Sequence, residues 1–287
     1  MVDLHLHSTA SDGHHSPGDL MRMAKGLGIK TVALTDHDTM YGIAEARDEA
    51  KTQGLRFIPG VEISAGGCPE THILGYGMDM DSPRLKELFE QMRRARRKRA
   101  MAFVGNLNEI GIPISYERVL DGASDEKAIG RPHIGKALVD MGFAHDLNDA
   151  FGKYLIKSAK TYAPREKVPI KQAIETINKA KGVAVLAHPA LLRYDARTLE
   201  NAVIYMKAIG ISGIECYHPT HSRDDVRFYR SLADRMGLMI TGGSDFHGGV
   251  PNASRPAPCP GDGVAEFYDA DERADMLIAE IKARNSS

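Results

Sequence analysis

Short apolar runs alternate with helical patterns at both ends of this sequence, and that alternation restricts its fold more than any other feature. The runs are VDLHLH (2–7), TVALT (31–35), RFIPGVEI (56–63), HILGYG (72–77), VAVLAH (183–188), GIECY (213–217) and LMITGG (238–243). Between the first two runs, Ser16 and Pro17 predict a helix start and Gly28 its end. Another predicted helix follows Thr39 and stops at Gly54. We therefore predict a parallel α/β sheet or barrel, whose ligands gather at the carboxyl ends of the strands.

The middle of the chain, residues 79–165, has a different pattern with no convincing strand. Helical patterns cover about 82–110, 132–141 and 146–153. We interpret 79–165 as a helical insertion domain, and 1–78 with 166–287 as the barrel. The insertion is expected to cap the barrel mouth, with a surface appendage of no active role as the alternative.

Composition excludes several classes of protein. With 43% hydrophobic and 26% charged residues, and no run near the roughly 18 apolar residues that span a bilayer, we expect no membrane segment. The 37 Lys and Arg nearly cancel the 38 Asp and Glu, so no overall field attracts duplex DNA. Cys68, Cys216 and Cys259 form no C-x-x-C pair, which argues against a disulfide framework or a thiolate zinc site. We expect a cytoplasmic protein without a signal peptide.

Two histidines share one face of the first predicted strand. Because side chains of a strand alternate between faces, His5 and His7 point the same way, opposite to Leu4 and Leu6. In a barrel the apolar face would meet the helices and leave the histidines inside. A buried imidazole is costly unless it is hydrogen-bonded or binds a metal. The H-x-H pattern alone is compatible both with a metal site and with a structural histidine pair.

Histidine and the carboxylate residues Asp and Glu recur at the ends of most other predicted strands. They are Asp12, Asp36, His37, Asp38, Glu62, His188, Asp245 and His247. His72 instead begins a strand. If residues 65–70 make a tight reversal, that strand runs antiparallel and begins beside Glu62, so we predict a hairpin here.

Nine of these positions form a candidate metal cluster of six imidazoles and three carboxylates. They are His5, His7, Asp12, His37, Glu62, His72, His188, Asp245 and His247. The set is too large for one four-coordinate ion and sufficient for two or three that share a carboxylate. Without thiolates it suits Zn²⁺, Mn²⁺ or Fe²⁺. Asp36, Asp38 and Ser244 are expected to orient neighbouring imidazoles, or else to be solvated loop residues or turn caps.

The net charge of such a metal cluster indicates the charge of its substrate. Three divalent ions bring six positive charges, and three carboxylates with one bound hydroxide return four. A dianionic phosphate would balance the remaining two. With two ions the sum is near zero, and the preference for an anion weakens.

Five motifs resemble those of the PHP (polymerase and histidinol phosphatase) phosphoesterases. They are D-L-H-L-H-S-x-x-S-D-G (3–13), T-D-H-D (35–38), P-G-x-E-I-S (59–64), A-H-P (187–189) and G-S-D-F-H (243–247). The resemblance implies a distorted (βα)7 barrel, related to the amidohydrolases, with up to three metal ions. It implies that Glu62 bridges two ions. It assigns His5, His7 and Asp245 to one ion, His72 and His188 to another, and Asp12, His37 and His247 to the third.

Within that family the chain is similar to a bacterial branch that acts on nucleotides. Those proteins remove the 3′-phosphate of nucleoside 3′,5′-bisphosphates or trim short RNA from its 5′ end. The expected reaction is attack of a metal-bridging hydroxide on phosphorus, with Glu62 and Asp245 as catalytic residues. His218 and His221 follow the sixth strand, and either could protonate the leaving oxygen, contact phosphate, or be a turn residue.

Four further residues are candidates for substrate contacts, together with His221. Arg131 and His133 lie at a predicted helix start in the insertion and could bind a second phosphate, or only begin that helix. Arg193 and Arg223 lie on loops after predicted strands. The basic run 93–99 spreads around its helix, which favours a solvated face over an RNA contact. The chain has no Trp, which favours mononucleotides or very short oligomers.

Other functions remain open from the sequence. A histidinol-phosphate-type phosphomonoesterase would share every metal ligand. A non-catalytic PHP scaffold is disfavoured by the complete ligand set. An amide hydrolase or deaminase on the related barrel usually has a carboxylated lysine or a single ion. We expect a small phosphorylated substrate and see no obligate protein partner.

Overall fold

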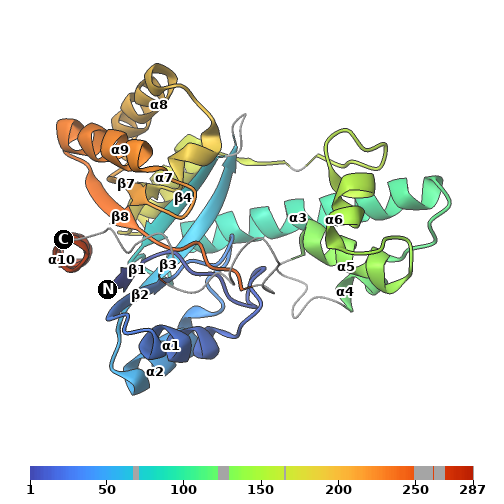
Figure 1. Cartoon of the computed structure of the whole chain (residues 1–287), viewed down its shortest axis with the longest axis horizontal. Coiled ribbons are helices and arrows are strands. Elements are labelled where there is room, and N and C mark those ends of the chain that lie inside the picture. Colours follow the sequence, from blue (N-terminus) through green and yellow to red (C-terminus); the bar gives the residue numbers. More distant parts are fainter. Residues whose placement is uncertain (67–70, 122–128, 165, 249–260, 262–268, 287) are drawn as a thin grey trace. The chain divides into compact units, whose positions relative to one another are not determined.

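The computed structural model describes residues 1–66, 71–121, 129–164, 166–248, 261 and 269–286. It divides into two compact units. The barrel unit is Met1–Leu88 with Val168–Ser287, and the insertion unit is Phe89–Lys167. Figure 1 shows the order of the elements along the chain. The strands are β1 (Val2–Asp3), β2 (Thr31–Leu34), β3 (Arg56–Gly66), β4 (Thr71–Tyr76), β5 (Val168–Pro169), β6 (Val183–Leu186), β7 (Gly213–Tyr217) and β8 (Met239–Gly242).

The helices of the barrel unit lie between these strands in the sequence, except α10, which follows β8. They are α1 (Pro17–Gly26), α2 (Ile43–Gln53), α7 (Ile170–Lys179), η3 (Pro189–Leu192), α8 (Ala196–Ala208), α9 (Arg223–Met236) and α10 (Ala270–Ser286). The α3 helix (Pro83–Glu109) begins in the barrel unit and continues into the insertion unit. None of the helices in the described ranges combines the length and apolar content that a bilayer-spanning segment needs.

The barrel unit contains one mixed sheet that nearly closes on itself. Its strand order is β1-β2-β3-β4-β6-β7-β8, and β5 pairs with β3. The Leu4 N–H donates to the Gly242 carbonyl at 3.1 Å, and Leu6 pairs in parallel with Phe246, which brings the first and last strands side by side. The predicted distorted α/β barrel is therefore confirmed. Sequence reasoning missed β5, which is two residues long and has one buried apolar side chain, Val168.

The predicted hairpin is confirmed. Strand β4 runs antiparallel to β3, with Ala65 opposite Thr71 and Ser64 opposite His72. The reversal itself, at 67–70, lies outside the described residues, as do Cys68 and Cys259. Strand β4 also runs antiparallel to β6, and the other paired strands of the sheet are parallel.

Local signals set the ends of the first helices. Ser16 Oγ accepts a hydrogen bond from the Asp19 N–H at 3.1 Å and caps α1. Gly54 closes α2 with φ of 67°, a conformation that costs glycine little. Strand β1 is shorter than predicted because the Leu6 N–H donates to Thr35 Oγ1 at 3.1 Å, so a side chain replaces the next ladder bond.

The insertion unit has a hydrophobic core of its own, which includes Phe103, Leu107 and Leu138. Besides most of α3 it contains α4 (Tyr116–Leu120), α5 (Arg131–Asp140), α6 (Leu147–Ala150) and the π-helix η2 (Phe151–Leu155). Its described residues include no strand. The expected insertion began at residue 79, whereas this unit begins at Phe89, inside α3.

Candidate metal centre

Donor atoms from both ends of the chain converge at the carboxyl ends of the barrel strands. Within the described part of the chain, three overlapping groups place one donor atom per residue within 4.8 Å of the others. The groups are His7, Asp12, His37 and His247; His5, His7, Glu62 and Asp245; and His37, Glu62 and His72. Each group could hold a metal ion, since His and carboxylate donors suit divalent cations.

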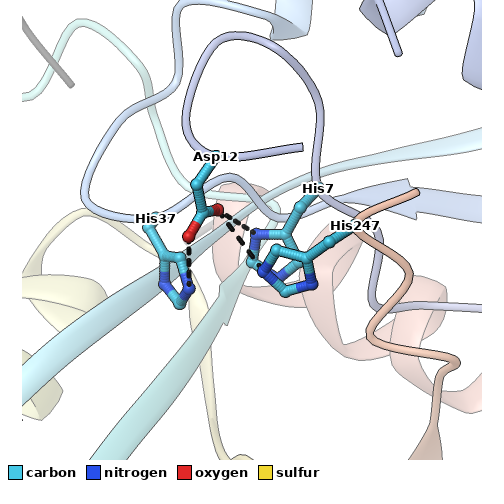
Figure 2. Close-up of side chains that lie close together, drawn as sticks. All are labelled: His7, Asp12, His37 and His247. Carbon is cyan, nitrogen blue, oxygen red and sulfur yellow. Dashed lines mark ion pairs between the residues drawn. The ribbon is translucent and has the colours of Figure 1, made fainter. Parts of the chain in front are cut away.

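The first group surrounds Asp12, as Figure 2 shows. Asp12 Oδ1 lies 3.9 Å from His7 Nδ1 and 3.4 Å from His247 Nε2. Asp12 Oδ2 lies 3.8 Å from His37 Nε2. The His7 and His247 rings stack with centroids 4.0 Å apart. One carboxylate therefore faces three imidazoles.

The second group is the most buried of the three. His5 Nε2 lies 3.4 Å from Glu62 Oε2 and 3.3 Å from Asp245 Oδ1. His7 Nε2 lies 3.3 and 3.1 Å from the same two oxygens. All four atoms are buried, and none has a hydrogen-bond partner among the described residues. Buried polar atoms are rarely left unpaired, so these donors fit a cation held between them.

Glu62 offers its two oxygens to different histidines. Oε1 lies 2.8 Å from both His72 Nδ1 and His188 Nε2. Oε2 lies 2.9 Å from His37 Nδ1, besides the two histidines of the second group. The structure thus brings eight of the nine predicted ligand positions into the three groups and places the ninth, His188, against Glu62. Among the three carboxylates, Glu62 is the one that two groups share.

The site attracts positive charge strongly. Burial alone would lower the pKa of His5, but the charges of Glu215, Asp245 and Glu62 raise it well above its usual value. Burial likewise opposes protonation of His7, but the carboxylates of Asp245 and Glu62, 3.1 and 3.3 Å from Nε2, raise its pKa to about 10. Burial would raise the pKa of Glu62, but the histidines around it lower it well below its usual value. The environment of these side chains therefore favours positive charge, which either protons or metal cations could supply.

Three serine–aspartate pairs join neighbouring strand ends around the centre. In each pair the serine N–H donates to one carboxylate oxygen at 2.7–2.9 Å, and Oγ donates to the other at 2.6–3.1 Å. The pairs are Ser8 with Asp36, Ser64 with Asp38, and Ser244 with Asp3. These bonds fix the backbone on which candidate ligands lie. Sequence reasoning had singled out Asp36, Asp38 and Ser244 and missed their partners.

The backbone is strained at three strand ends. Asp38, His188 and Asp245 have φ of 56°, 26° and 52°. Residues with a Cβ rarely adopt positive φ, at a cost of roughly 1–3 kcal/mol each, and such strain gathers at functional sites. His188 and Asp245 are candidate ligands, and Asp38 follows another.

Glu215 on β7 is the main buried residue that sequence reasoning missed. It is fully buried, and its oxygens lie 2.9 Å from His5 Nδ1 and 2.8 Å from the His188 N–H. The available signal was a single carboxylate inside the apolar run GIECY. The neighbouring Cys216 is a buried free thiol, and burial raises its pKa, so it is an inert core residue.

The two mouth histidines carry their protons on different atoms. The Thr220 N–H donates to His218 Nδ1 at 3.2 Å, which places the proton of neutral His218 on Nε2, 3.3 Å from Asp245 Oδ2. His221 Nδ1 lies 3.0 Å from the Cys216 carbonyl, which only accepts, so His221 carries its proton on Nδ1. Burial lowers the pKa of His221 to about 4, which leaves this ring neutral at pH 7.

The candidate substrate contacts lie in both units. In the insertion unit, His133 Nδ1 accepts the Gly130 N–H at 3.1 Å and so caps α5, and the Arg131 guanidinium lies 5.6 Å from the Phe151 ring centre. In the barrel unit, Arg193 and Arg223 are exposed, after η3 and at the start of α9. The cap at His133 supports the alternative expected for this pair, in which Arg131 and His133 only begin helix α5.

The PHP domain model matches residues 3–129. A Chromobacterium violaceum 3′,5′-nucleoside bisphosphate phosphatase is 36% identical over 86% of this chain and 87% of its own length. The Escherichia coli 5′-3′ exoribonuclease Rnm is 35% identical over 91% of this chain and 86% of its own.

A solved structure has the same fold as this chain over nearly its whole length. An amidohydrolase from Chromobacterium violaceum, with bound sulfate and no metal, superposes with a TM-score of 0.82 at 31% identity, over 99% of this chain and 96% of its own. The similarity extends over nearly the whole chain and includes the strands that carry the His, Asp and Glu cluster. The chain belongs to the PHP family of metal-dependent phosphoesterases.

Proposed function

We propose that this protein hydrolyses the 3′-phosphate of nucleoside 3′,5′-bisphosphates, with two or three divalent ions (Mn²⁺, Zn²⁺ or Fe²⁺) in the nine-residue cluster. The observation that carries the proposal is the group of four buried donor atoms without hydrogen-bond partners, on His5, His7, Glu62 and Asp245. The substrate class is supported by the Chromobacterium relative, which is 36% identical.

The residues of the cluster hold and orient the ions. When bound, divalent ions polarise phosphoryl oxygens and lower the pKa of bound water. Glu62 presents Oε1 to His72 and His188, and Oε2 to the other histidines, so we assign it the shared position. Asp245 Oδ1 faces the His5 and His7 rings while Oδ2 faces His218. Asp245 therefore lies between two candidate ligands and the His218 ring.

We assign the proton donor for the leaving oxygen to His218. Its Nε2–H points toward Asp245. A second proton on Nδ1 would be donated to Thr220 Oγ1, 2.8 Å away, and would replace the hydrogen bond from the Thr220 N–H. His221 presents only a lone pair at Nε2, which suits an acceptor of a substrate hydroxyl. An alkoxide leaving group gains roughly 10²–10⁴-fold from such a proton donor.

The second phosphate of the substrate requires cationic groups beyond the metal ligands. Our candidates are Arg193 and Arg223 in the barrel unit, and Arg131 and His133 in the insertion unit, which we propose as a cap. Guanidinium groups bind phosphate through paired N–H donors. We propose short 5′-phosphorylated oligoribonucleotides as further substrates, since a 35% identical relative is named an exoribonuclease.

One comparison tests the proposal. Purified protein is analysed for bound metals, and phosphate release is measured with adenosine 3′,5′-bisphosphate, histidinol phosphate and a short 5′-phosphorylated RNA. We expect two or three equivalents of metal and the highest kcat/KM with the bisphosphate. Preference for histidinol phosphate would assign the phosphomonoesterase alternative, and a metal-loaded protein without turnover would assign a scaffold.

A further inference from the structure

We infer that Glu215 is a positioning residue of the metal centre, whose two carboxylate oxygens fix the proton of His5 on Nδ1 and hold the backbone of His188. The inference rests on the metal centre of the proposed function. It concerns a residue that supplies no ligand atom to any of the three groups.

The contact with His5 determines which ring nitrogen is available for a metal. An ionised carboxylate only accepts hydrogen bonds, so at 2.9 Å from Glu215 Oε1, His5 Nδ1 must carry the proton. The lone pair is then on Nε2, which faces Glu62 Oε2 and Asp245 Oδ1 at 3.4 and 3.3 Å. This is the arrangement in which metal-binding histidines commonly donate their other N–H to a carboxylate.

The second oxygen of Glu215 holds a different candidate ligand. Oε2 accepts the backbone N–H of His188 at 2.8 Å, and His188 has φ of 26°, a conformation that residues with a Cβ rarely adopt. The His188 ring meets Glu62 Oε1, whereas His5 faces Glu62 Oε2. Glu215 thus supports ligands on both sides of the shared carboxylate.

The isosteric change Glu215→Gln distinguishes a positioning role from a role in core packing alone, because it keeps the shape of the side chain and alters its hydrogen bonds. Both oxygens of Glu215 accept, one from a ring and one from a backbone N–H. Glu215→Gln keeps the shape but supplies one oxygen and one NH₂. If the NH₂ faces His5, Nδ1 must accept, and the proton moves to Nε2, where it blocks the metal. If the NH₂ faces His188, two donors oppose each other and the backbone is displaced.

The test measures Mn²⁺ affinity of the full-length protein, by titration into metal-free samples. Glu215→Gln is expected to weaken Mn²⁺ binding by about 10–100-fold, the usual effect of losing such a partner. The matched control is Glu272→Gln, at an exposed glutamate of α10, and it should bind as the unmodified protein does. Equal affinities of Glu215→Gln and the unmodified protein would overturn the inference and leave the proposed function intact. Failure of the unmodified protein to bind any of Mn²⁺, Zn²⁺ and Fe²⁺ in the same titration would overturn both.

A spectroscopic measurement gives a second test that does not depend on the folding of Glu215→Gln. In the Zn²⁺-loaded, ¹⁵N-histidine-labelled protein, the signals of His5 are identified as those absent from His5→Asn. We expect a proton on Nδ1 of His5 and none on Nε2. A proton on Nε2, or an unprotonated Nδ1, would contradict the inference whatever the variant shows.

Discussion

Ser244 donates two hydrogen bonds to Asp3, a residue 241 positions earlier in the sequence, through its N–H at 2.9 Å and its Oγ at 2.6 Å. Asp3 is fully buried and also accepts the N–H groups of His5 and Gly261. Because Asp3 ends β1 and Ser244 follows β8, the pair closes the barrel beside Asp245. The contact thus supports both the closure of the sheet, together with the backbone pairing of Leu4 with Gly242, and the placement of this candidate ligand.

Ser244→Ala should therefore destabilise the barrel. It removes the Oγ bond to a buried carboxylate, which contributes roughly 1.5–3 kcal/mol, while the N–H bond remains. Urea unfolding of metal-free protein measures the loss. Ser231→Ala, at an exposed position of α9, is the control. An equal effect of both changes would show that the Ser244–Asp3 pair contributes little.

Loss of Glu62 should remove more metal than loss of Asp12. Glu62 belongs to two of the three groups and Asp12 to one, so Glu62→Gln weakens two positions and Asp12→Asn one. Elemental analysis should show the larger deficit for Glu62→Gln, and its kcat/KM should fall more than ~100-fold, beyond the effect of losing an outer partner. Equal deficits in the two variants would argue against a shared carboxylate.

The metal-free protein should lose stability as the pH rises. In the folded state the pKa of His7 is raised from 6.5 to about 10. The stabilisation from its charged form is complete below pH 6.5 and disappears as the pH rises through about 10. Thermal unfolding in chelator should show a falling Tm from pH 6.5 to 10, and a smaller fall for His7→Asn. His145→Asn, at an exposed histidine, should match the unmodified protein. Bound metal should abolish the trend, since the ion replaces the proton.

His218→Asn should affect substrates according to their leaving groups. If its Nε2–H protonates the leaving oxygen, release of a ribose alkoxide should slow by ~10²–10⁴-fold, whereas a nitrophenyl phosphate, whose phenolate leaves readily, should be affected much less. Equal losses with both substrates would assign His218 to phosphate binding. His221→Asn should show no such difference, because its Nδ1 proton faces the Cys216 carbonyl.

Charge reversal in the basic run 93–99 should have little effect on turnover. Arg94 pairs with Glu90, Lys98 with Glu166, and the Arg99 guanidinium lies 5.4 Å from the Phe103 ring centre. Exposed pairs of this kind contribute about 0–1 kcal/mol. Arg94→Glu is thus expected to change kcat/KM by less than about fivefold with both a mononucleotide and a short RNA. A loss confined to the RNA would identify this helix as an RNA contact.

The sequence by itself determined the barrel and the nine candidate ligand positions. Alternation along a strand placed His5 and His7 on one face, and parallel pairing brings strand ends to one edge of a sheet. The alternation is local to one strand, and the shared edge follows from the order of strands and helices along the chain, so both can be predicted from the sequence. The hairpin that carries His72 followed from the same reasoning.

The tertiary structure alone decided how those positions are held. Glu215 meets His5 from 210 residues away and His188 from 27, and a lone acid in an apolar strand has no periodicity that would reveal such partners. Likewise the proton positions of His218 and His221 depend on Thr220 N–H and the Cys216 carbonyl. Hydrogen bonds are directional and short, so which atoms they join depends on the folded backbone, whereas periodicity depends only on the order of residues.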